Sequence, residues 1–283
     1  MKIGYYPGCS LSGTGKEYDL SLKKVLSFLD VELEEINDWS CCGATSAHAT
    51  NHLLSTALPS RNLSLAKKQN LSELLAPCAA CYNRLIVSQH EIKKNPQIKK
   101  QTSELFGEDD YKGISVINII ELFEKIGKDK IIEKRQKELK GIKAACYYGC
   151  LLVRPFEITG FDDSEQPHSM EEIISAAGAV PIDWNFRMEC CGASHSIAHM
   201  EIVVDLSEKI INDASLHGAD VIVVACPMCH SNLDMRQRAM KNNKKMPVLY
   251  LSEFIGLALG IKAGELGLNL HFTSSEKLLE KVK

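Results

Sequence analysis

The sequence predicts an α/β fold of two tandem, duplicated domains, each built on a short parallel sheet. Two observations predict it: a cysteine pattern that occurs twice, and an alternation of short apolar strands with amphipathic helices. Of the 283 residues, 45% are hydrophobic and 24% are charged, and the net charge is −3. This composition is typical of globular proteins. A net charge this close to zero gives no sign of the excess basic charge that is typical of nucleic-acid-binding proteins.

The duplication is visible in ten of the eleven cysteines. Each half contains a Gly-Cys, then a Cys-Cys-Gly, then a Cys-x-x-Cys, separated by 31 and 35 residues in the first half and by 39 and 34 in the second. These ten candidate ligands are Cys9, Cys41, Cys42, Cys78, Cys81, Cys150, Cys190, Cys191, Cys226 and Cys229. The eleventh, Cys146, is interpreted as a small buried residue on a strand.

The predicted elements follow in the same order in both halves. Strands are predicted directly before the cysteine motifs, over residues 2–6, 33–36, 74–76, 143–148, 180–182 and 220–225. Apolar residues at helical spacing predict helices over 18–29, 170–177 and 200–214. The charged stretch 127–141 is predicted to be a solvated helix or connector, which places the domains at residues 1–140 and 141–283.

Because every cysteine motif follows a strand, the five cysteines of each half are expected to converge. Parallel strands end at one edge of a sheet, and ligands bind at that edge in open α/β folds. A helix is expected after each Cys-Cys-Gly, with its free amide groups directed at an anionic ligand. Its candidate N-caps are Thr45 or Ser46 in the first half and Ser194 or Ser196 in the second.

The cysteine spacing favours a polynuclear iron–sulfur centre in each half. Five thiols exceed the four ligands of tetrahedral zinc, and two adjacent cysteines are easier to place on two metal atoms than on one, because a rigid peptide bond joins them. Structural zinc in one or both halves is the main alternative. Cys226-Pro227-Met228-Cys229 alone is typical of a thioredoxin-like dithiol, but its repetition with three companion cysteines argues against that interpretation.

No catalytic residue is predicted beyond the metal-binding cysteines. Histidines near the motifs are interpreted as hydrogen-bonding or surface residues rather than proton donors: His48, His195, His199 and His230. Three arginines could bind a carboxylate or phosphate of a substrate but are expected to be solvated or ion-paired: Arg61, Arg84 and Arg154. The tryptophans before each Cys-Cys, Trp39 and Trp184, are expected to be packing residues rather than contacts of the site.

The doubled motif resembles the cysteine-rich CCG-domain family, and within it the B-type subunits of heterodisulfide reductase. The resemblance lies in Gly8-Cys9, in the stretches 38–43 and 76–82, and in Leu251-Ser252-Glu253-Phe254. It implies two tandem Rossmann-like CCG domains in which the ten cysteines hold two noncubane [4Fe-4S] clusters at the carboxyl ends of the strands. It also implies that the clusters face each other across a substrate cleft.

The resemblance implies the catalytic iron–sulfur subunit of an oxidoreductase complex that reduces a disulfide, either CoM-S-S-CoB or a related one. The implied partners are a small cubane iron–sulfur subunit, heterodisulfide reductase C-like, and an A-like flavin subunit. The alternatives are an electron-transfer subunit of a succinate-, lactate-, glycolate- or quinone-linked complex, and a zinc-stabilised interaction module. With no signal-peptide core at Met1 to Cys9 and no apolar run long enough to span a membrane, we expect a cytoplasmic protein.

Overall fold

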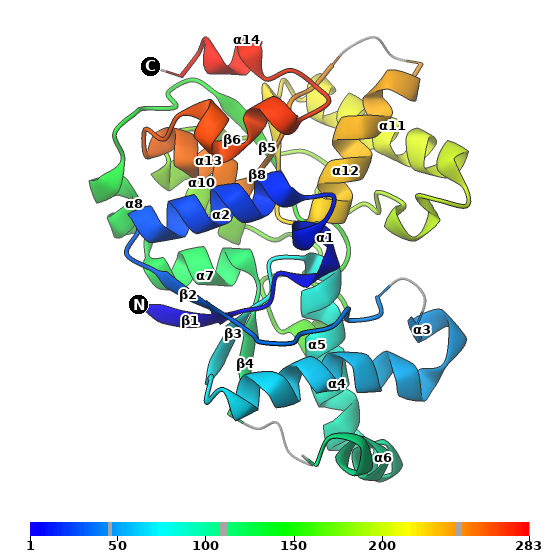
Figure 1. Cartoon of the computed structure of the whole chain (residues 1–283). Helices are drawn as coiled ribbons and strands as arrows, with labels where there is room; N and C mark the ends of the chain where they lie inside the picture. The colour runs from blue at the N-terminus through cyan, green and yellow to red at the C-terminus, as the bar shows by residue number, and fades with distance from the viewer. Residues whose placement is uncertain (45–46, 108–112, 242–244, 283) are drawn as a thin grey trace.

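Two four-stranded parallel sheets form the framework of the computed structural model, which describes residues 1–44, 47–107, 113–241 and 245–282 (Figure 1). The first sheet has the order β2-β1-β3-β4, with β1 (Lys2–Tyr5), β2 (Glu32–Glu35), β3 (Glu73–Leu75) and β4 (Ser115–Ile117). The second has the order β6-β5-β7-β8, with β5 (Lys143–Tyr147), β6 (Val180–Pro181), β7 (Val221–Val224) and β8 (Val248–Tyr250). The equivalent strand orders confirm the predicted α/β duplication.

Helices surround both sheets. In the first half these are α1 (Gly8–Ser12), α2 (Lys16–Phe28), α3 (Ala47–Thr50), α4 (His52–Lys68), α5 (Ala79–Lys94), α6 (Pro96–Phe106), α7 (Ile119–Ile126) and α8 (Lys128–Lys134). In the second half they are α9 (Phe156–Thr159), α10 (Ser169–Ala176), α11 (Met200–Leu216), α12 (Pro227–Met235), α13 (Leu251–Ala258) and α14 (Glu276–Leu279). The described part of the second half also contains the 3₁₀ turns η1 (Ala193–His195), η2 (Arg236–Ala239), η3 (Ala263–Leu266) and η4 (Leu268–Leu270).

Local sequence patterns account for most of these elements. The six predicted strands lie within one residue of observed strands, and the three predicted helices are α2, α10 and α11. The β7 strand is buried at all four positions, as expected for an apolar strand covered on both faces. The charged stretch 127–141 contains α8, which buries Ile131 against the core. The domain boundary near residue 140 stays a prediction.

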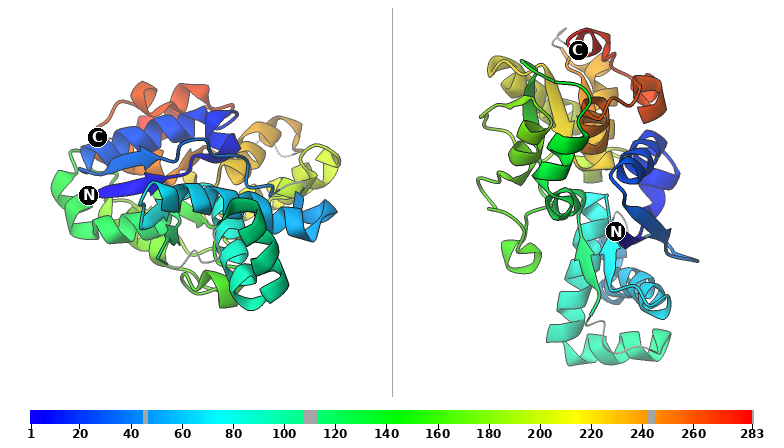
Figure 2. Two further views of the ribbon diagram at one scale, coloured as in Figure 1. Left: turned by 60° about the horizontal axis from the view of Figure 1, so that its bottom comes forward. Right: turned by 90° about the vertical axis from the view of Figure 1, so that its left-hand side faces the viewer.

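The two halves are joined by an exchange of helices. The α2 helix, which comes after β1, packs against α13, which follows β8 (Figures 1 and 2). In the same way α10, which comes after β5, packs against α7, which follows β4. At the first of these contacts the hydroxyl groups of Ser21 and Ser252 are 2.7 Å apart, and the rings of Tyr18 and Tyr250 stack with centroids 4.1 Å apart. This exchange fixes the position of one sheet relative to the other.

Candidate metal centre

The cysteine motifs lie just beyond the carboxyl ends of three strands of each sheet, in loops or at the starts of helices. In the first half, Cys9 comes after β1, the Cys41-Cys42 pair after β2, and Cys78 after β3 at the start of α5. The second half repeats this placement after β5, β6 and β7. The convergence of five cysteines at one sheet edge in each half is therefore confirmed.

The first set of thiols forms a connected group. The Sγ atoms of Cys9 and Cys41 are 3.9 Å apart, and those of Cys42 and Cys81 are 3.4 Å apart. The Cys78 and Cys81 thiols shift each other's pKa, and so do the thiols of Cys41 and Cys42. Side chains from three different turns thus share one small volume.

The second set repeats these contacts. The Sγ atoms of Cys191 and Cys229 are 3.5 Å apart. The thiols of Cys150 and Cys190 shift each other's pKa, and so do those of Cys226 and Cys229. The duplicated sequence therefore builds the same arrangement of five thiols twice.

The two sets meet at the seam between the halves. The thiols of Cys78 and Cys226 shift each other's pKa there, raising that of Cys78 and lowering that of Cys226, and both residues are buried. At the far ends of the sets, Cys9, Cys41 and Cys190 are exposed. Each set therefore extends from the molecular surface to a shared buried contact.

Mutual contact displaces the pKa values of the thiols in opposite directions. Hydrogen bonds from Cys42 and Cys9 lower the pKa of Cys41, whereas the hydrogen bond with Cys41 raises the pKa of Cys9. In the second set the hydrogen bond from Cys150 lowers the pKa of Cys190, and the same contact raises the pKa of Cys150. Thiols this close can all ionise only if cations compensate their charge, which is the chemistry of a metal-binding set.

Backbone amide groups also point at the thiols. The amide of Gly43 lies 3.4 Å from the Cys41 sulfur, and the amide of Gly192 lies 3.3 Å from the Cys190 sulfur. The α5 and α12 helices begin directly after Cys78 and Cys226, and neither has a side-chain cap. Their free N-terminal amides and positive dipole ends favour an anionic group at this position.

A glycine before the first cysteine of each set leaves room for a thiol from another turn. Gly8 and Gly149 both have a φ of +66°, in the left-handed region that side chains disfavour. A Cβ atom on Gly8 would lie 2.9 Å from the Cys81 sulfur, and one on Gly149 would lie 3.2 Å from the Cys229 sulfur. The Gly-Cys motif is thus required both by the backbone conformation and by the packing of sulfur.

A family model described as a cysteine-rich domain, CCG, matches residues 3–86 and 144–234, one match in each half. The chain belongs to the CCG cysteine-rich domain family. Its two CCG regions contain all ten of the predicted ligands.

Two curated relatives match this CCG protein over nearly its whole length. It is 32% identical to the 8-methylmenaquinol:fumarate reductase membrane anchor subunit of Wolinella succinogenes, over 98% of this chain and 99% of the relative. It is 29% identical to the B-type subunit of the ferredoxin:CoB-CoM heterodisulfide reductase of Methanosarcina mazei, over 99% of this chain and 97% of the relative. The predicted relationship to the B-type subunits of heterodisulfide reductase is therefore confirmed.

A crystal structure of a hypothetical protein from Helicobacter pylori has a similar fold, with a TM-score of 0.76 at 13% identity. The alignment covers 96% of the CCG protein and 52% of that longer chain, so the CCG protein spans about half of it. None of the helices that the structure describes has the length and hydrophobicity needed to cross a bilayer.

The helix after the second Cys-Cys-Gly of the CCG protein begins later than predicted. It is α11, whose N-cap position is occupied by His199. Ser194 lies inside η1, and the Ser196 hydroxyl is 2.9 Å from the Asn232 side-chain oxygen. The prediction that Ser194 or Ser196 caps this helix is therefore wrong, because a 3₁₀ turn follows Gly192 and Ser196 is bound to α12 instead. The corresponding candidates Thr45 and Ser46 lie outside the described residues.

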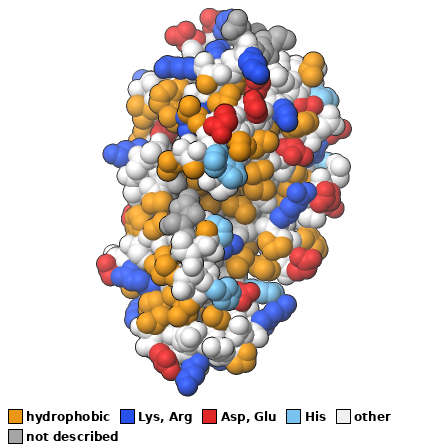
Figure 3. Space-filling model, turned by 90° about the vertical axis from the view of Figure 1, so that its right-hand side faces the viewer, with side chains coloured by type: hydrophobic (Ala, Val, Ile, Leu, Met, Phe, Trp, Pro, Cys, Tyr) orange, Lys and Arg blue, Asp and Glu red, His pale blue; other side chains and the backbone are white. Residues whose placement is uncertain are grey.

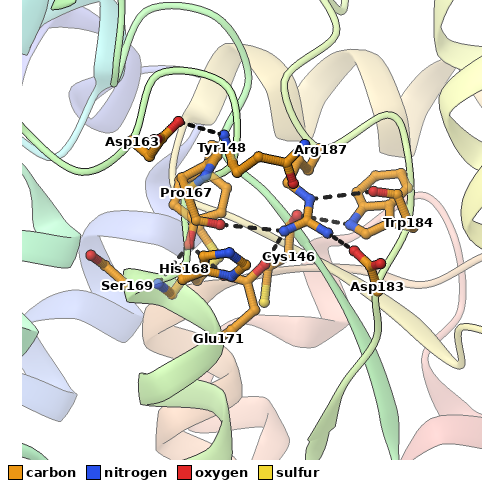
Figure 4. A network of polar contacts seen from close by, with 12 residues as sticks. Cys146, Tyr148, Asp163, Pro167, His168, Ser169, Glu171, Asp183, Trp184 and Arg187 are labelled. Carbon is orange, nitrogen blue, oxygen red and sulfur yellow. Dashed lines mark hydrogen bonds and ion pairs between the residues drawn. The ribbon is translucent and has the colours of Figure 1, made fainter.

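A buried arginine that sequence analysis missed supports the second set (Figure 4). The Arg187 side chain is only 5% exposed and forms ion pairs with Glu171 and Asp183. Its carbonyl oxygen accepts hydrogen bonds from the amides of Tyr148 and Gly149, at 3.0 and 3.2 Å. The Tyr148 hydroxyl also donates to Glu171. Arg187 thereby links the α10 helix to the turn that carries Cys150.

A second buried polar group lies beside α13. Glu253 accepts hydrogen bonds from the amide of Tyr250, at 2.8 Å, and from the His271 ring, at 2.9 Å. Burial raises the pKa of Glu253 to about 7. The sequence repeat could have identified Glu253 as a helix-capping residue, because Glu121 closes an equivalent capping box on α7 in the first half.

The other residues singled out from the sequence occupy structural or surface positions. Cys146 is fully buried on β5, as predicted. His48, His195 and His199 are exposed, whereas His230 is buried and lies 3.0 Å from the Val248 carbonyl oxygen. Arg61 and Arg154 form ion pairs with Asp38 and Glu165. Trp39 packs edge-on against Tyr6, and Trp184 is buried, as expected.

Hydrophobic and histidine side chains gather along the middle of the face on which α3, α11 and α12 lie (Figure 3). Exposed hydrophobic residues of these and neighbouring elements are Leu54, Ile197, Met200, Ile202 and Met235. Exposed apolar groups of this kind are typical of surfaces that contact a partner.

Proposed function

We propose that this CCG protein is the iron–sulfur subunit of a multi-subunit reductase complex, with one noncubane [4Fe-4S] cluster in each five-cysteine set. The observation that carries the proposal is the convergence of five thiols in each half, with Cys78 and Cys226 interacting between the two sets. Five thiols per set exceed what tetrahedral zinc requires. The amides of Gly43 and Gly192, which donate to cysteine sulfurs, and the N-termini of α5 and α12 suit an anionic cluster.

We further propose that the reaction is the two-electron reduction of a disulfide, CoM-S-S-CoB or a related one. Iron–sulfur clusters supply electrons singly, so two adjacent centres can together provide the pair that a disulfide requires. The chain's own contribution is to position the two sets, through the α2–α13 and α7–α10 contacts, and to hold the thiols in their turns. Support comes from the relationship to the B-type subunits of heterodisulfide reductase.

The complex requires partners, since the chain contains no G-x-G-x-x-G and no P-loop sequence for a nucleotide or flavin. We propose a cubane iron–sulfur subunit and a flavin subunit as the electron source, and a cytoplasmic location. The exposed ends of the two sets, at Cys9, Cys41 and Cys190, are where electrons or substrate could reach the thiols from outside.

A second candidate is a quinone-linked electron-transfer subunit in which no disulfide is cleaved. The observation that favours it is the 32% identity to the 8-methylmenaquinol:fumarate reductase subunit. The exposed hydrophobic side chains near α11 and α12 are compatible with an apolar partner.

The first test is the iron, acid-labile sulfide and zinc content of protein purified without oxygen. We expect about eight irons and eight sulfides per chain, as two four-iron clusters require. Cys9→Ser is expected to lose or distort the cluster of the first half alone, leaving about four irons, because Cys9 contacts thiols of its own set. One or two zinc ions with little iron would replace the proposal with a zinc-held scaffold.

A second test separates the two candidate reactions. In a disulfide reductase, added thiol under oxidising conditions should perturb the electron paramagnetic resonance (EPR) signal of a cluster. In a quinone-linked relay the thiol should leave that signal unchanged, while a menaquinol analogue should reduce the clusters in the isolated complex. Cys146→Ser is a suitable control, because Cys146 is a buried thiol outside both sets.

A further inference from the structure

The two cysteine sets differ in the charge of one neighbouring side chain. The α5 and α12 helices begin within the two Cys-x-x-Cys motifs, and the residue three positions after the second cysteine is Arg84 in α5 and Asn232 in α12. Three residues correspond to about one helical turn, so both side chains lie on the same face as that cysteine. Equivalent positions of the repeat thus carry a cation in one half and a neutral amide in the other.

Both positions are close in the fold to the second cysteine of the Cys-Cys pair, Asn232 by direct contact and Arg84 by way of Cys81. The Asn232 amide nitrogen is 3.1 Å from the Cys191 carbonyl oxygen and 3.6 Å from the Cys191 sulfur. Arg84 is one turn beyond Cys81, whose sulfur is 3.4 Å from that of Cys42. A Cys42 thiolate interacts electrostatically with the Arg84 guanidinium and opposes the lowering of its pKa by burial.

The charge of Arg84 is not neutralised by a carboxylate among the residues that the structure describes. Its guanidinium donates at 3.0 Å to the side-chain oxygen of Asn83, a neutral amide. Asn83 is itself buried, and its amide donates across the seam to the carbonyl oxygens of Leu151 and Arg154, at 3.2 and 2.9 Å. The cation is therefore held in place next to the first set, whereas Arg61 and Arg154 are paired with surface carboxylates.

A fixed cation beside sulfur ligands favours the reduced, more negative state of the centre that they hold. Net charge and hydrogen bonding near the sulfurs are among the factors that set the reduction potential of an iron–sulfur centre, and a charge in a partly buried place is weakly screened. The neutral Asn232 provides a hydrogen bond without the charge. The imidazole of His195 interacts with Cys190 in the second set, but it is exposed, so solvent and salt screen it.

We propose that Arg84 makes the first cysteine set the higher-potential member of the pair, so that electrons entering the chain collect at Cys9, Cys41, Cys42, Cys78 and Cys81. This inference rests on the proposed pair of clusters. The step is a one-electron exchange: one electron leaves the second set as one arrives at the first, and no bond or proton is transferred. It assigns the second set to electron entry and the first to delivery.

The test is an anaerobic redox titration of the loaded protein at about pH 8, monitored by EPR. The two signals are assigned with Cys9→Ser and Cys150→Ser, each of which removes the cluster of its own half. We expect the signal absent from Cys9→Ser to have the higher midpoint potential. Arg84→Gln should lower that potential by about 59 mV, a tenfold change in a one-electron equilibrium. The midpoint potential of the second set should shift by less than about 18 mV, which is a twofold change in the same equilibrium. Arg84→Lys keeps the charge and should retain most of the difference.

Equal midpoint potentials in the unchanged protein, or an Arg84→Gln variant with full iron content and an unmoved first signal, would overturn the proposal. Should Arg84→Gln lose iron, Arg84→Met offers a second neutral side chain, and the ordering of the two signals in the unchanged protein still decides. An iron content near zero in the unchanged protein would reject the proposed function itself, and is measured before any titration.

Discussion

The sharpest test of the cysteine arrangement is to add a single methyl group at Gly8, where the backbone packs against the Cys81 sulfur. Gly8 has a φ of +66°, and a Cβ atom there would lie 2.9 Å from the Cys81 sulfur. The left-handed conformation costs a residue with a side chain about 1–2 kcal/mol. Forcing a methyl group against a packed neighbour costs about a further 1–3 kcal/mol. We therefore expect Gly8→Ala to lower the free energy of unfolding by about 2–5 kcal/mol in total.

Gly160 provides the matched control. It also has a left-handed φ, of +54°, but a Cβ atom there meets no heavy atom of the described chain within 4 Å. Gly160→Ala should therefore show the conformational cost alone, about 1–2 kcal/mol. Gly149→Ala should fall between the two variants, because its Cβ atom would meet the Cys229 sulfur at the longer distance of 3.2 Å.

The assay is urea denaturation of the reduced, metal-free protein, followed by circular dichroism, together with the iron content of each loaded variant. Gly8→Ala should lose iron from the first set, because Cys81 must move to make room, and Gly160→Ala should keep all of its iron. If Gly8→Ala and Gly160→Ala had the same stability and the same iron content, the close packing of the Gly-Cys turn against Cys81 would not be a requirement of the site.

Two further predictions concern the buried polar groups. Burial raises the pKa of Glu253 from 4.5 to about 7, so the folded chain keeps a proton that the unfolded chain has lost. The free energy of unfolding should therefore fall by about 3 kcal/mol as the pH rises from about 4 to about 8, and urea titrations of Glu253→Gln should show a flatter profile. Arg187→Met leaves Glu171 buried without its cation and should cost about 3 kcal/mol. It should also deplete iron from the second set, whereas Arg154→Met, which removes an exposed ion pair, should cost less than about 1 kcal/mol and no iron.

The sheets and the convergence of the thiols were predictable because both depend on local patterns. A strand of alternating or continuous apolar residues followed by a Gly-Cys or Cys-x-x-Cys turn specifies where the chain leaves the sheet. Parallel pairing then brings the turns to one edge without further information. Cys9, Cys42 and Cys81 are 33 or more residues apart in the chain, yet their contacts follow from three strands pairing in register.

The buried polar groups could not be predicted in this way. Arg187 lies in a stretch whose sequence is typical of a loop, and its burial depends on Glu171 from a helix 16 residues earlier. Glu253 and His271 become partners only after the chain beyond α13 folds back onto it. Such contacts depend on tertiary packing, which periodicity does not report.

The helix exchange explains why the two sets touch at their buried ends. Because α2 leaves the first half to pack on α13, and α10 of the second half packs on α7, the two halves cannot separate without exposing the buried faces of these helices. Cys78 and Cys226 directly precede α5 and α12. These helices are held at the same seam, where Asn83 of α5 binds the loop that follows Cys150. The duplication thus supplies two equal sites, whereas the exchange brings them together. Differences such as Arg84 and Asn232 can then give the pair a direction, because an electron shared between two neighbouring centres collects at the one with the higher potential.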